Sequence, residues 1–329
     1  MSDIDFLIKR GEACFSEGLF DLAISNYSQA IAAGDGSSLL YCLRAKAYLE
    51  KAWQQAGRAP FEEEAYEKWA DAFGRRPELQ LALADAAQAV SLDPKNSEAY
   101  YGLGEIQIDK RCWAEAIAAF DKCLELVPDD AEAMYWRAVA FDELGDTAKA
   151  LETLGEAIAA NADSHEAYYM RSQILVSGGG LEEALADISK AIALDPEAAE
   201  YFLQRGKVLS YMSEKPGGAA HLAEAIEDFS EALRLDPKLA EAYNWRGLAY
   251  MQAGEEKKEL KDLNALLALE PGHAEGYRLR YECQAARGKR LEAAVDWLYL
   301  CFLNPKAIVA PIAEAAGNAR ADFKKYSGN

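Results

Sequence analysis

Long apolar runs are missing from this 329-residue sequence, and so is a basic leader at its N-terminus. No stretch approaches the roughly 20 apolar residues that a transmembrane helix needs. The first residues, MSDIDFLIKRGEACF, carry acids where a signal peptide carries basic residues, and Lys9 and Arg10 interrupt the apolar segment. We therefore expect no membrane association and a cytoplasmic location.

Cysteine and histidine are too few and too scattered to build a metal site. The six cysteines show no CxxC spacing, and most fall on apolar helical positions, where a free thiol acts as a small hydrophobic group. The three histidines lie far apart, at positions 165, 221 and 273. We expect structural thiols, no metal and no cofactor.

Basic residues are outnumbered, with 35 Lys and Arg against 55 Asp and Glu, which gives a net charge of −20. This charge repels nucleic-acid phosphates, so a DNA- or RNA-binding role is disfavoured. An acidic surface keeps the protein soluble, and it also favours partners that are basic.

Motifs of known catalytic sites are absent as well. The segment SGGGLEE at 177–183 resembles a phosphate-binding loop only in its glycines, because no Gly-Lys-Ser/Thr follows and no strand precedes it. The sequence also contains no HExxH motif and suggests no Ser/His/Asp grouping. We expect these glycines to turn one helix into the next, and we expect no enzymatic activity.

What the sequence does contain is an internal repeat. Segments such as SLDPKNSEAYYGLG at 91, ALDPEAAEYFLQRG at 193 and RLDPKLAEAYNWRG at 234 recur, and two amphipathic segments of about a dozen residues lie between them. Six of the eight resulting units are 34 residues long, the second has 25 extra residues at about 52–76, and the sixth has seven. The units are 4–37, 38–96, 97–130, 131–164, 165–198, 199–239, 240–273 and 274–307, which leaves 308–329 as a tail.

The unit at 97–130 resembles the tetratricopeptide repeat family, whose 34-residue unit is a helix–turn–helix. The residues that carry the resemblance are Tyr100, Leu103, Gly104, Trp113, Ala116, Phe120 and Pro128. The resemblance implies an all-α fold, a right-handed α-solenoid of eight tandem helix pairs with a concave inner surface, in which the tail forms a C-terminal capping helix. The unit at 240–273 departs from the pattern at Glu259 and Leu266, so we expect its second helix to pack less closely.

An arginine recurs on the apolar stripe of the first helices, at the seventh position of seven of the eight units. Wherever the second helix has aspartate 16 template positions later, the unit also has this arginine, and the one unit with Leu103 has Ala119 instead. A guanidinium can bind a carboxylate while its stem covers apolar surface. We therefore predict structural ion pairs within units rather than binding residues: Arg44–Asp85, Arg171–Asp187, Arg205–Asp228, Arg246–Asp262 and Arg280–Asp296.

A second stripe of the first helices, which the family's geometry places on the concave surface, is the candidate binding site. Aromatic residues beside acids suit an extended peptide with apolar and basic side chains, although these tyrosines could equally pack against adjacent helices. The candidates are Tyr101, Tyr135, Tyr169, Trp136, Glu105, Asp109, Asp142, Glu143 and Trp245. Relatives that clamp acidic chaperone tails have Lys, Asn and Arg on this stripe, so a co-chaperone role of that type is not expected.

The extra residues of the second unit form the other irregular feature. Pro60 can begin a helix there, and Tyr66, Trp69 and Phe73 make an aromatic stripe at helical spacing. We expect this stripe to fold back on the first two units, with a dedicated docking element as the alternative.

These observations together predict a non-enzymatic scaffold or adaptor that binds a protein or peptide in its groove, as a monomer. The alternative is a structural role in which the solenoid self-associates into a homo-oligomer, through the insertion or an end of the array.

Overall fold

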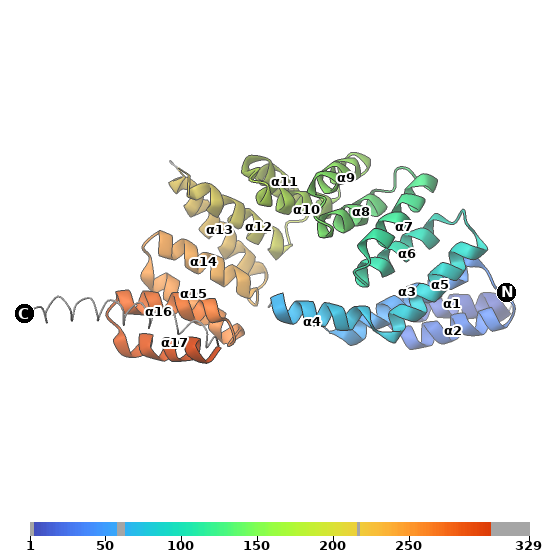
Figure 1. Cartoon of the computed structure of the whole chain (residues 1–329), viewed down its shortest axis with the longest axis horizontal. Helices are drawn as coiled ribbons and strands as arrows, with labels where there is room; N and C mark the ends of the chain where they lie inside the picture. The colour runs from blue at the N-terminus through green and yellow to red at the C-terminus, as the bar shows by residue number, and fades with distance from the viewer. Residues whose placement is uncertain (1–2, 58–62, 216–217, 304–329) are drawn as a thin grey trace, which may run out of the picture. The chain divides into compact units, whose positions relative to one another are not determined.

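The fold was analysed in a computed structural model that describes residues 3–57, 63–215 and 218–303. Over these residues all regular structure is α-helical, as Figure 1 shows, which confirms the predicted all-α class. None of the described helices is both long and apolar enough to cross a membrane. The described residues also contain no cluster of His, Cys, Asp and Glu side chains able to hold a metal ion.

The chain forms two compact units, Met1–Ile174 and Leu175–Asn329, and each is described by itself. The boundary falls inside α10 (His165–Ser177). The first unit also contains α1 (Asp3–Ser16), α2 (Phe20–Ala32), α3 (Ser38–Ala56), α4 (Glu63–Gly74), α5 (Pro77–Leu92), α6 (Ser97–Asp109), α7 (Trp113–Leu126), α8 (Ala131–Glu143) and α9 (Thr147–Ala160). The second contains α11 (Leu181–Leu194), α12 (Ala199–Ser213), α13 (Ala219–Leu235), α14 (Ala240–Gln252), α15 (Glu256–Leu269), α16 (Ala274–Ala286) and α17 (Arg290–Leu303).

Capping side chains and left-handed residues set the helix ends. Asn96 accepts a hydrogen bond from the Ala99 amide at the start of α6, and Asp130 accepts bonds from the amides of Glu132 and Ala133 at the start of α8. Glycines with positive φ make the turns within several pairs, for example Gly254 at 73° between α14 and α15. These local signals explain why a helix–turn–helix recurs along the chain.

Within each unit the helices pack as consecutive pairs. The pairs are α1 with α2, α3 with α5, α6 with α7, α8 with α9, α12 with α13, α14 with α15, and α16 with α17. The second helix of most pairs also packs against the first helix of the next, as α7 does against α8 and α13 against α14. A continuous core therefore runs through each unit, and no pair buries its apolar face alone.

Three pairs depend on a glycine at the helix crossing. A Cβ on Gly11, Gly104 or Gly206 would lie 2.4–2.6 Å from an aromatic ring of the second helix. In the α14–α15 pair Leu263 takes the place of that ring, and a Cβ on Gly247 would lie 3.7 Å from it, at ordinary contact distance. Close approach at the crossing is thus tied to a large aromatic residue opposite.

The structure brings together four of the five predicted Arg–Asp pairs, each with two parallel hydrogen bonds. Arg246 donates from Nε and Nη2 to the two carboxylate oxygens of Asp262 at 2.7 and 2.8 Å, and Asp262 is only 2% exposed. The equivalent contacts join Arg44 to Asp85, Arg205 to Asp228 and Arg280 to Asp296. Arg171 and Asp187 belong to different compact units, and their pairing stays a prediction.

Several of these arginines also reach the preceding helix pair. Arg44 donates from Nη1 to Ser28 at 3.0 Å, Arg246 to Ser230 at 3.0 Å, and Arg280 to Asn264 at 2.6 Å. Each acceptor lies 16 residues before its arginine, in the second helix of the preceding pair. The guanidinium therefore joins three helices, which a contact within one pair does not require.

The two positions at which α15 departs from the repeat pattern are both buried, and the expectation that this helix packs less closely stays a prediction. Glu259 is 4% exposed and Leu266 is fully buried. The leucine lies close to Gly276 of α16, where a Cβ would come within 3.0 Å of its Cδ2 atom, so the absence of a side chain in the next pair leaves room for it. Burial raises the pKa of the Glu259 carboxyl.

The insertion in the second repeat packs on other helices of the Met1–Ile174 unit. Phe73 of α4 is buried, and its ring lies 4.3 Å from that of Trp53 and 5.2 Å from that of Trp69. The contacts of α4 include α6, and Phe73 joins the core formed by α3, α5 and α6. The aromatic stripe thus folds back on the second and third predicted repeats, where the first two were expected, while the side chain of Tyr66 lies outside the described residues.

Candidate binding site

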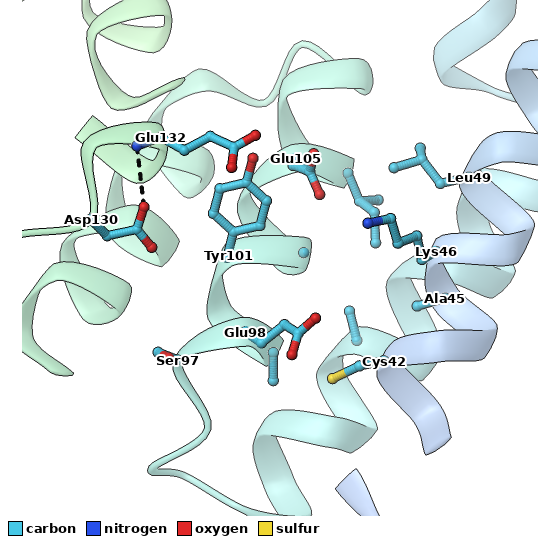
Figure 2. A pocket seen from close by; sticks show the side chains of 14 residues that line it. Cys42, Ala45, Lys46, Leu49, Ser97, Glu98, Tyr101, Glu105, Asp130 and Glu132 are labelled. Carbon is cyan, nitrogen blue, oxygen red and sulfur yellow. Dashed lines mark hydrogen bonds between the residues drawn. The ribbon is translucent and has the colours of Figure 1, made fainter. Parts of the chain in front are cut away.

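A cavity of about 320 Å³ opens between α3, α6 and α8, the first helices of three successive pairs. Tyr101 and Glu105 of α6 lie one helical turn apart and face it, as Figure 2 shows. Lys46 enters from α3, and Glu132 comes from the first turn of α8. The remaining lining residues are Cys42, Ala45, Leu49, Ala86, Ser97, Glu98, Ala99, Gly102, Ile106 and Asp130.

Tyr101 lies among the acidic side chains that line this cavity. Its ring packs edge-on against Phe120 at 5.9 Å, and its hydroxyl points between the side chains of Glu105 and Glu132 (Figure 2). The hydroxyl oxygen is buried and has no hydrogen-bond partner among the described residues. Burial, followed by the two nearby carboxylates, raises the pKa of Tyr101 far above its usual value, so the hydroxyl remains a neutral donor.

Two carboxyl groups of α6 are held in unfavourable surroundings. Burial, together with the charges of Glu132 and Asp109, raises the pKa of Glu105 to about 7, and the charge of Lys46 opposes this shift. Burial also raises the pKa of Asp109 to about 7, although the Trp53 indole donates a hydrogen bond to it at 2.9 Å. Near neutral pH this face of α6 therefore holds negative charge that a bound cation would stabilise.

A second cavity, of about 370 Å³, lies beside the first and is formed by α8, α10 and the loop before α10. Tyr135 and Trp136 line it, with their rings 5.2 Å apart in an edge-on arrangement, and Glu132 borders both cavities. Burial, followed by the charge of Glu166, raises the pKa of Tyr135. Successive first helices thus present successive aromatic and acidic cavities.

Only some of the predicted binding residues line the two cavities. Tyr101 and Glu105 share the first cavity, and Tyr135 and Trp136 share the second. Asp109 lies on the same helix face but binds Trp53 at the insertion. Elsewhere in the first unit, Tyr169 and Asp142 are partly buried and Glu143 is exposed, while Trp245 belongs to the second unit, where it packs against Tyr211 and Phe229.

Tyr101 and Tyr135 pack on neighbouring helices and also line cavities, so the structure is compatible with both interpretations that the sequence left open. Trp53 is the residue that sequence reasoning missed. It lies 56 positions from Asp109, before Pro60 breaks the helical pattern, and the only signal was an unassigned tryptophan within the insertion.

Comparison with known proteins identifies the repeats. Three models described as Tetratricopeptide repeat match residues 67–131, residues 113–174, and residues 165–198 with 240–273, and one described as TPR repeat matches residues 221–254. No curated protein sequence matches the chain.

Solved structures share the fold at low sequence identity. A structure of Pseudomonas aeruginosa pilF is 22% identical with a TM-score of 0.58, over 68% of this chain and 98% of that one. The C-terminal part of a TPR repeat-containing protein from Cytophaga hutchinsonii is 16% identical with a TM-score of 0.57, over 83% and 98%. A chain of the APC/C hetero-tetramer Cut9–Hcn1 is also 16% identical with a TM-score of 0.57, over 92% of this chain and 53% of that one. These likenesses concern the fold alone.

Proposed function

Because the chain belongs to the tetratricopeptide repeat family, we propose that it is a non-enzymatic scaffold that binds a protein partner through an extended, basic segment. The site is the pair of neighbouring cavities on the first helices of the Met1–Ile174 unit.

The observation that carries the proposal is the excess of negative charge around Tyr101. Glu98, Glu105 and Glu132 line the first cavity, and Lys46 is the one basic side chain among its lining residues. The cationic group of a Lys or Arg side chain would pair with the carboxylates of Glu105 and Glu132. It could also make a cation–π contact with the ring of Tyr101. The net charge of −20 would speed the encounter with such a partner.

The second cavity supports an apolar or aromatic residue next to that cation. Tyr135 and Trp136 offer ring surface there, and Glu132 lies between the two positions. Aromatic anchors of this kind commonly supply most of the affinity at protein interfaces. A basic residue followed by an apolar residue is therefore the recognition pattern that these cavities favour.

Fluorescence anisotropy with labelled peptides tests the proposal. The full chain should bind peptides that combine Lys or Arg with aromatic residues more tightly than peptides of the same length with Glu in place of the basic residues. Glu105→Gln combined with Glu132→Gln should weaken this binding at least tenfold, because it removes two carboxylates from the cavity.

The matched control is Glu115→Gln combined with Glu152→Gln. Both residues are exposed on second helices of the same two pairs, so the change in net charge is identical. Equal loss of binding in both variants would reduce the effect to overall charge and would contradict the proposed site.

A further inference from the structure

Two pairs of consecutive basic residues meet where the insertion ends. Arg75 and Arg76 follow Gly74, the last residue of α4, and Lys110 and Arg111 follow the last residue of α6. The ends of the two helices touch, because a Cβ on Gly74 would lie 3.5 Å from the Cα of Lys110. The Nζ atom of Lys110 also donates a hydrogen bond to the Gly74 carbonyl oxygen at 3.5 Å. The contact therefore gathers basic residues in a protein whose net charge is −20.

The contacts of the two arginines after α4 leave them able to bind a ligand. The hydrogen bonds of Arg76 go to two neutral groups, the Oε1 atom of Gln55 at 3.5 Å and its backbone oxygen at 3.3 Å. Arg75 pairs with Asp71, but their side chains are 77% and 60% exposed. Exposed ion pairs of this kind add little to stability, and long hydrogen bonds to neutral acceptors are weaker than charge-assisted ones. A carboxylate can therefore replace these partners at little cost to the fold.

A cavity of about 340 Å³ lies beside these arginines, and both line it. Trp69 and Phe73 form its aromatic wall, with ring centroids 5.2 Å apart and ring planes within 4° of parallel. The other lining residues are Ala56, Ala72 and Pro77. Cavities of this size that combine apolar walls with a few polar groups are typical ligand sites. This one suits an apolar side chain next to an anionic group.

The aromatic wall is fixed by contacts within the protein itself. Phe73 is 3% exposed, and its ring lies 4.3 Å from that of Trp53. The Trp69 indole donates a hydrogen bond to the backbone oxygen of Ala56 at 3.5 Å, and the Trp53 indole donates one to Asp109 at 2.9 Å. Ordering such a wall on binding would cost free energy, so a wall that is already packed favours binding.

Charge selects the class of ligand. Guanidinium groups bind carboxylates through two parallel hydrogen bonds, which favours Asp or Glu over a neutral residue. A nucleic acid would extend its phosphates far beyond the site, where the net charge of −20 repels them. A short acidic segment presents few charges, and at physiological ionic strength charges more than about 8 Å away are largely screened. The site therefore suits a short acidic segment of a protein.

We propose that Trp69, Phe73, Arg75 and Arg76 form a second binding site, which takes an acidic segment of a protein partner. One Asp or Glu carboxylate of that segment binds the arginines, and an adjacent apolar or aromatic side chain packs against the rings. The insertion then has a role in recognition in addition to its packing. This site is separate from the acidic cavities that we propose to bind a basic segment, so the two proposals can fail independently.

Fluorescence anisotropy with the full chain and a labelled peptide that combines Glu with Phe tests the site, at an ionic strength of about 0.15 M. The peptide should bind more tightly than its counterpart with Gln in place of Glu. Arg75→Gln combined with Arg76→Gln should weaken binding about tenfold or more, because both guanidinium groups are removed. The control Lys122→Gln combined with Lys149→Gln, at exposed positions of α7 and α9, changes the net charge equally and should leave the affinity unchanged.

Filling the cavity tests the apolar half of the site without a change in charge. Ala72 is exposed and lines the cavity, so Ala72→Phe should weaken binding severalfold while the melting temperature stays close to that of the wild type. Ala118→Phe, at an exposed position of α7, is the matched control and should bind like the wild type. Arg75 is exposed as well, so Arg75→Gln alone gives a charge variant that does not depend on the packing of Arg76.

The proposal is contradicted if the acidic peptide does not bind, if the arginine and lysine variants lose affinity equally, or if Ala72→Phe binds like the wild type. An oligonucleotide that competes for the site and binds more tightly than the peptide would also contradict it, since the site would then prefer a polyanion. The arginine variant should still bind a Lys-containing peptide as the wild type does, because the acidic cavities are intact. Loss of both peptides would overturn the assignment of a separate site, whereas failure of the acidic peptide alone leaves the proposed function in place.

Discussion

The α6–α7 and α14–α15 pairs have the same helix–turn–helix arrangement, but different side chains join their two helices. Where α14 has Arg246, joined to Asp262 and Ser230, α6 has Leu103, which packs in the core formed with α3 and α5. Where Gly104 lies under the ring of Phe120, Gly247 lies under the smaller Leu263. The turn of one pair has Arg111 with φ of 56°, and the turn of the other has Gly254 with φ of 73°.

This comparison separates what the architecture requires from what the site requires. Either an ion pair or an apolar contact can join the two helices at the same position. The pair without the ion pair is also the one that presents Tyr101 and Glu105 to the binding cavity. Charge on the core stripe therefore joins helices, while the carboxylates on the neighbouring stripe line the cavity that we propose as the binding site.

The ion pair gives the largest expected effect. Asp262→Ala should lower the free energy of unfolding by about 3–5 kcal/mol, because Arg246 would be left partly buried without its carboxylate. Arg246→Leu combined with Asp262→Ala reproduces the residues of the α6–α7 pair and should recover all but about 1–2 kcal/mol of this loss. Denaturant unfolding followed by circular dichroism measures both.

Asp121→Ala is the control for this pair, because Asp121 binds Arg137 at an exposed position and its loss should cost less than about 1 kcal/mol. If the double variant were no more stable than Asp262→Ala, the two ways of joining the helices would not be equivalent.

The glycines at the crossings give the next effect. Gly104→Ala places a Cβ 2.6 Å from the Phe120 ring and should destabilise the fold by about 1–3 kcal/mol. Gly247→Ala meets nothing closer than 3.7 Å and should be neutral or stabilising by up to about 1 kcal/mol, because alanine favours the helix. Thermal unfolding of the two variants should show opposite shifts, and equal shifts would refute the role given to the aromatic ring.

Ionisation of Glu105 should give a pH-dependent effect of about 1–2 kcal/mol, less than the full shift implies because the side chain is partly exposed. The pKa is about 7 in the folded chain and 4.5 as the ordinary value, so between these values the folded state binds more protons than the unfolded state. The contribution of Glu105 to stability is therefore full below pH 4.5 and is lost as the pH rises toward 8.

Glu105→Gln should accordingly be more stable than the wild type at pH 8 and similar to it at pH 5, as measured by unfolding at the two pH values. Glu115→Gln, at an exposed position of α7, should match the wild type at both. A Glu105 variant that is less stable at pH 8 would show that the carboxylate is well compensated.

The turns give the smallest effect. Arg111→Gly should stabilise the fold by about 0.5 kcal/mol, since glycine adopts positive φ freely and the loss of the Arg111 contact with the Trp113 ring offsets part of the gain. Gly254→Ala should destabilise it by about 1 kcal/mol. Paired melting curves would resolve the two signs, and the same sign in both would contradict the account of the turns.

Much of the fold could be predicted from the sequence because its signals are local and repeated. The Arg–Asp pairs could be found by comparing units, since Leu103 and Ala119 change together. The room for Leu266 could not, because it depends on Gly276 of the next pair. The contact between Trp53 and Asp109 depends on how the insertion folds back, and no periodic pattern encodes that.

The candidate site was predictable only in part for the same reason. Helical spacing places Tyr101 and Glu105 on one face, but the cavity exists because Lys46 and Glu132 arrive from two other helices. The raised pKa of Glu105 follows from that assembly and is not a property of the α6 sequence.

The affinity of the full chain for one Lys- and aromatic-containing peptide, measured at pH 6 and at pH 8, tests the central claim most directly. Glu105 is mostly protonated at pH 6 and mostly ionised at pH 8, so the wild type should bind severalfold more tightly at pH 8 while Glu105→Gln should bind equally weakly at both. Equal affinity of the wild type at the two pH values, or undiminished binding by Glu105→Gln at pH 8, would contradict the assignment of this cavity as the site that holds the partner's cation.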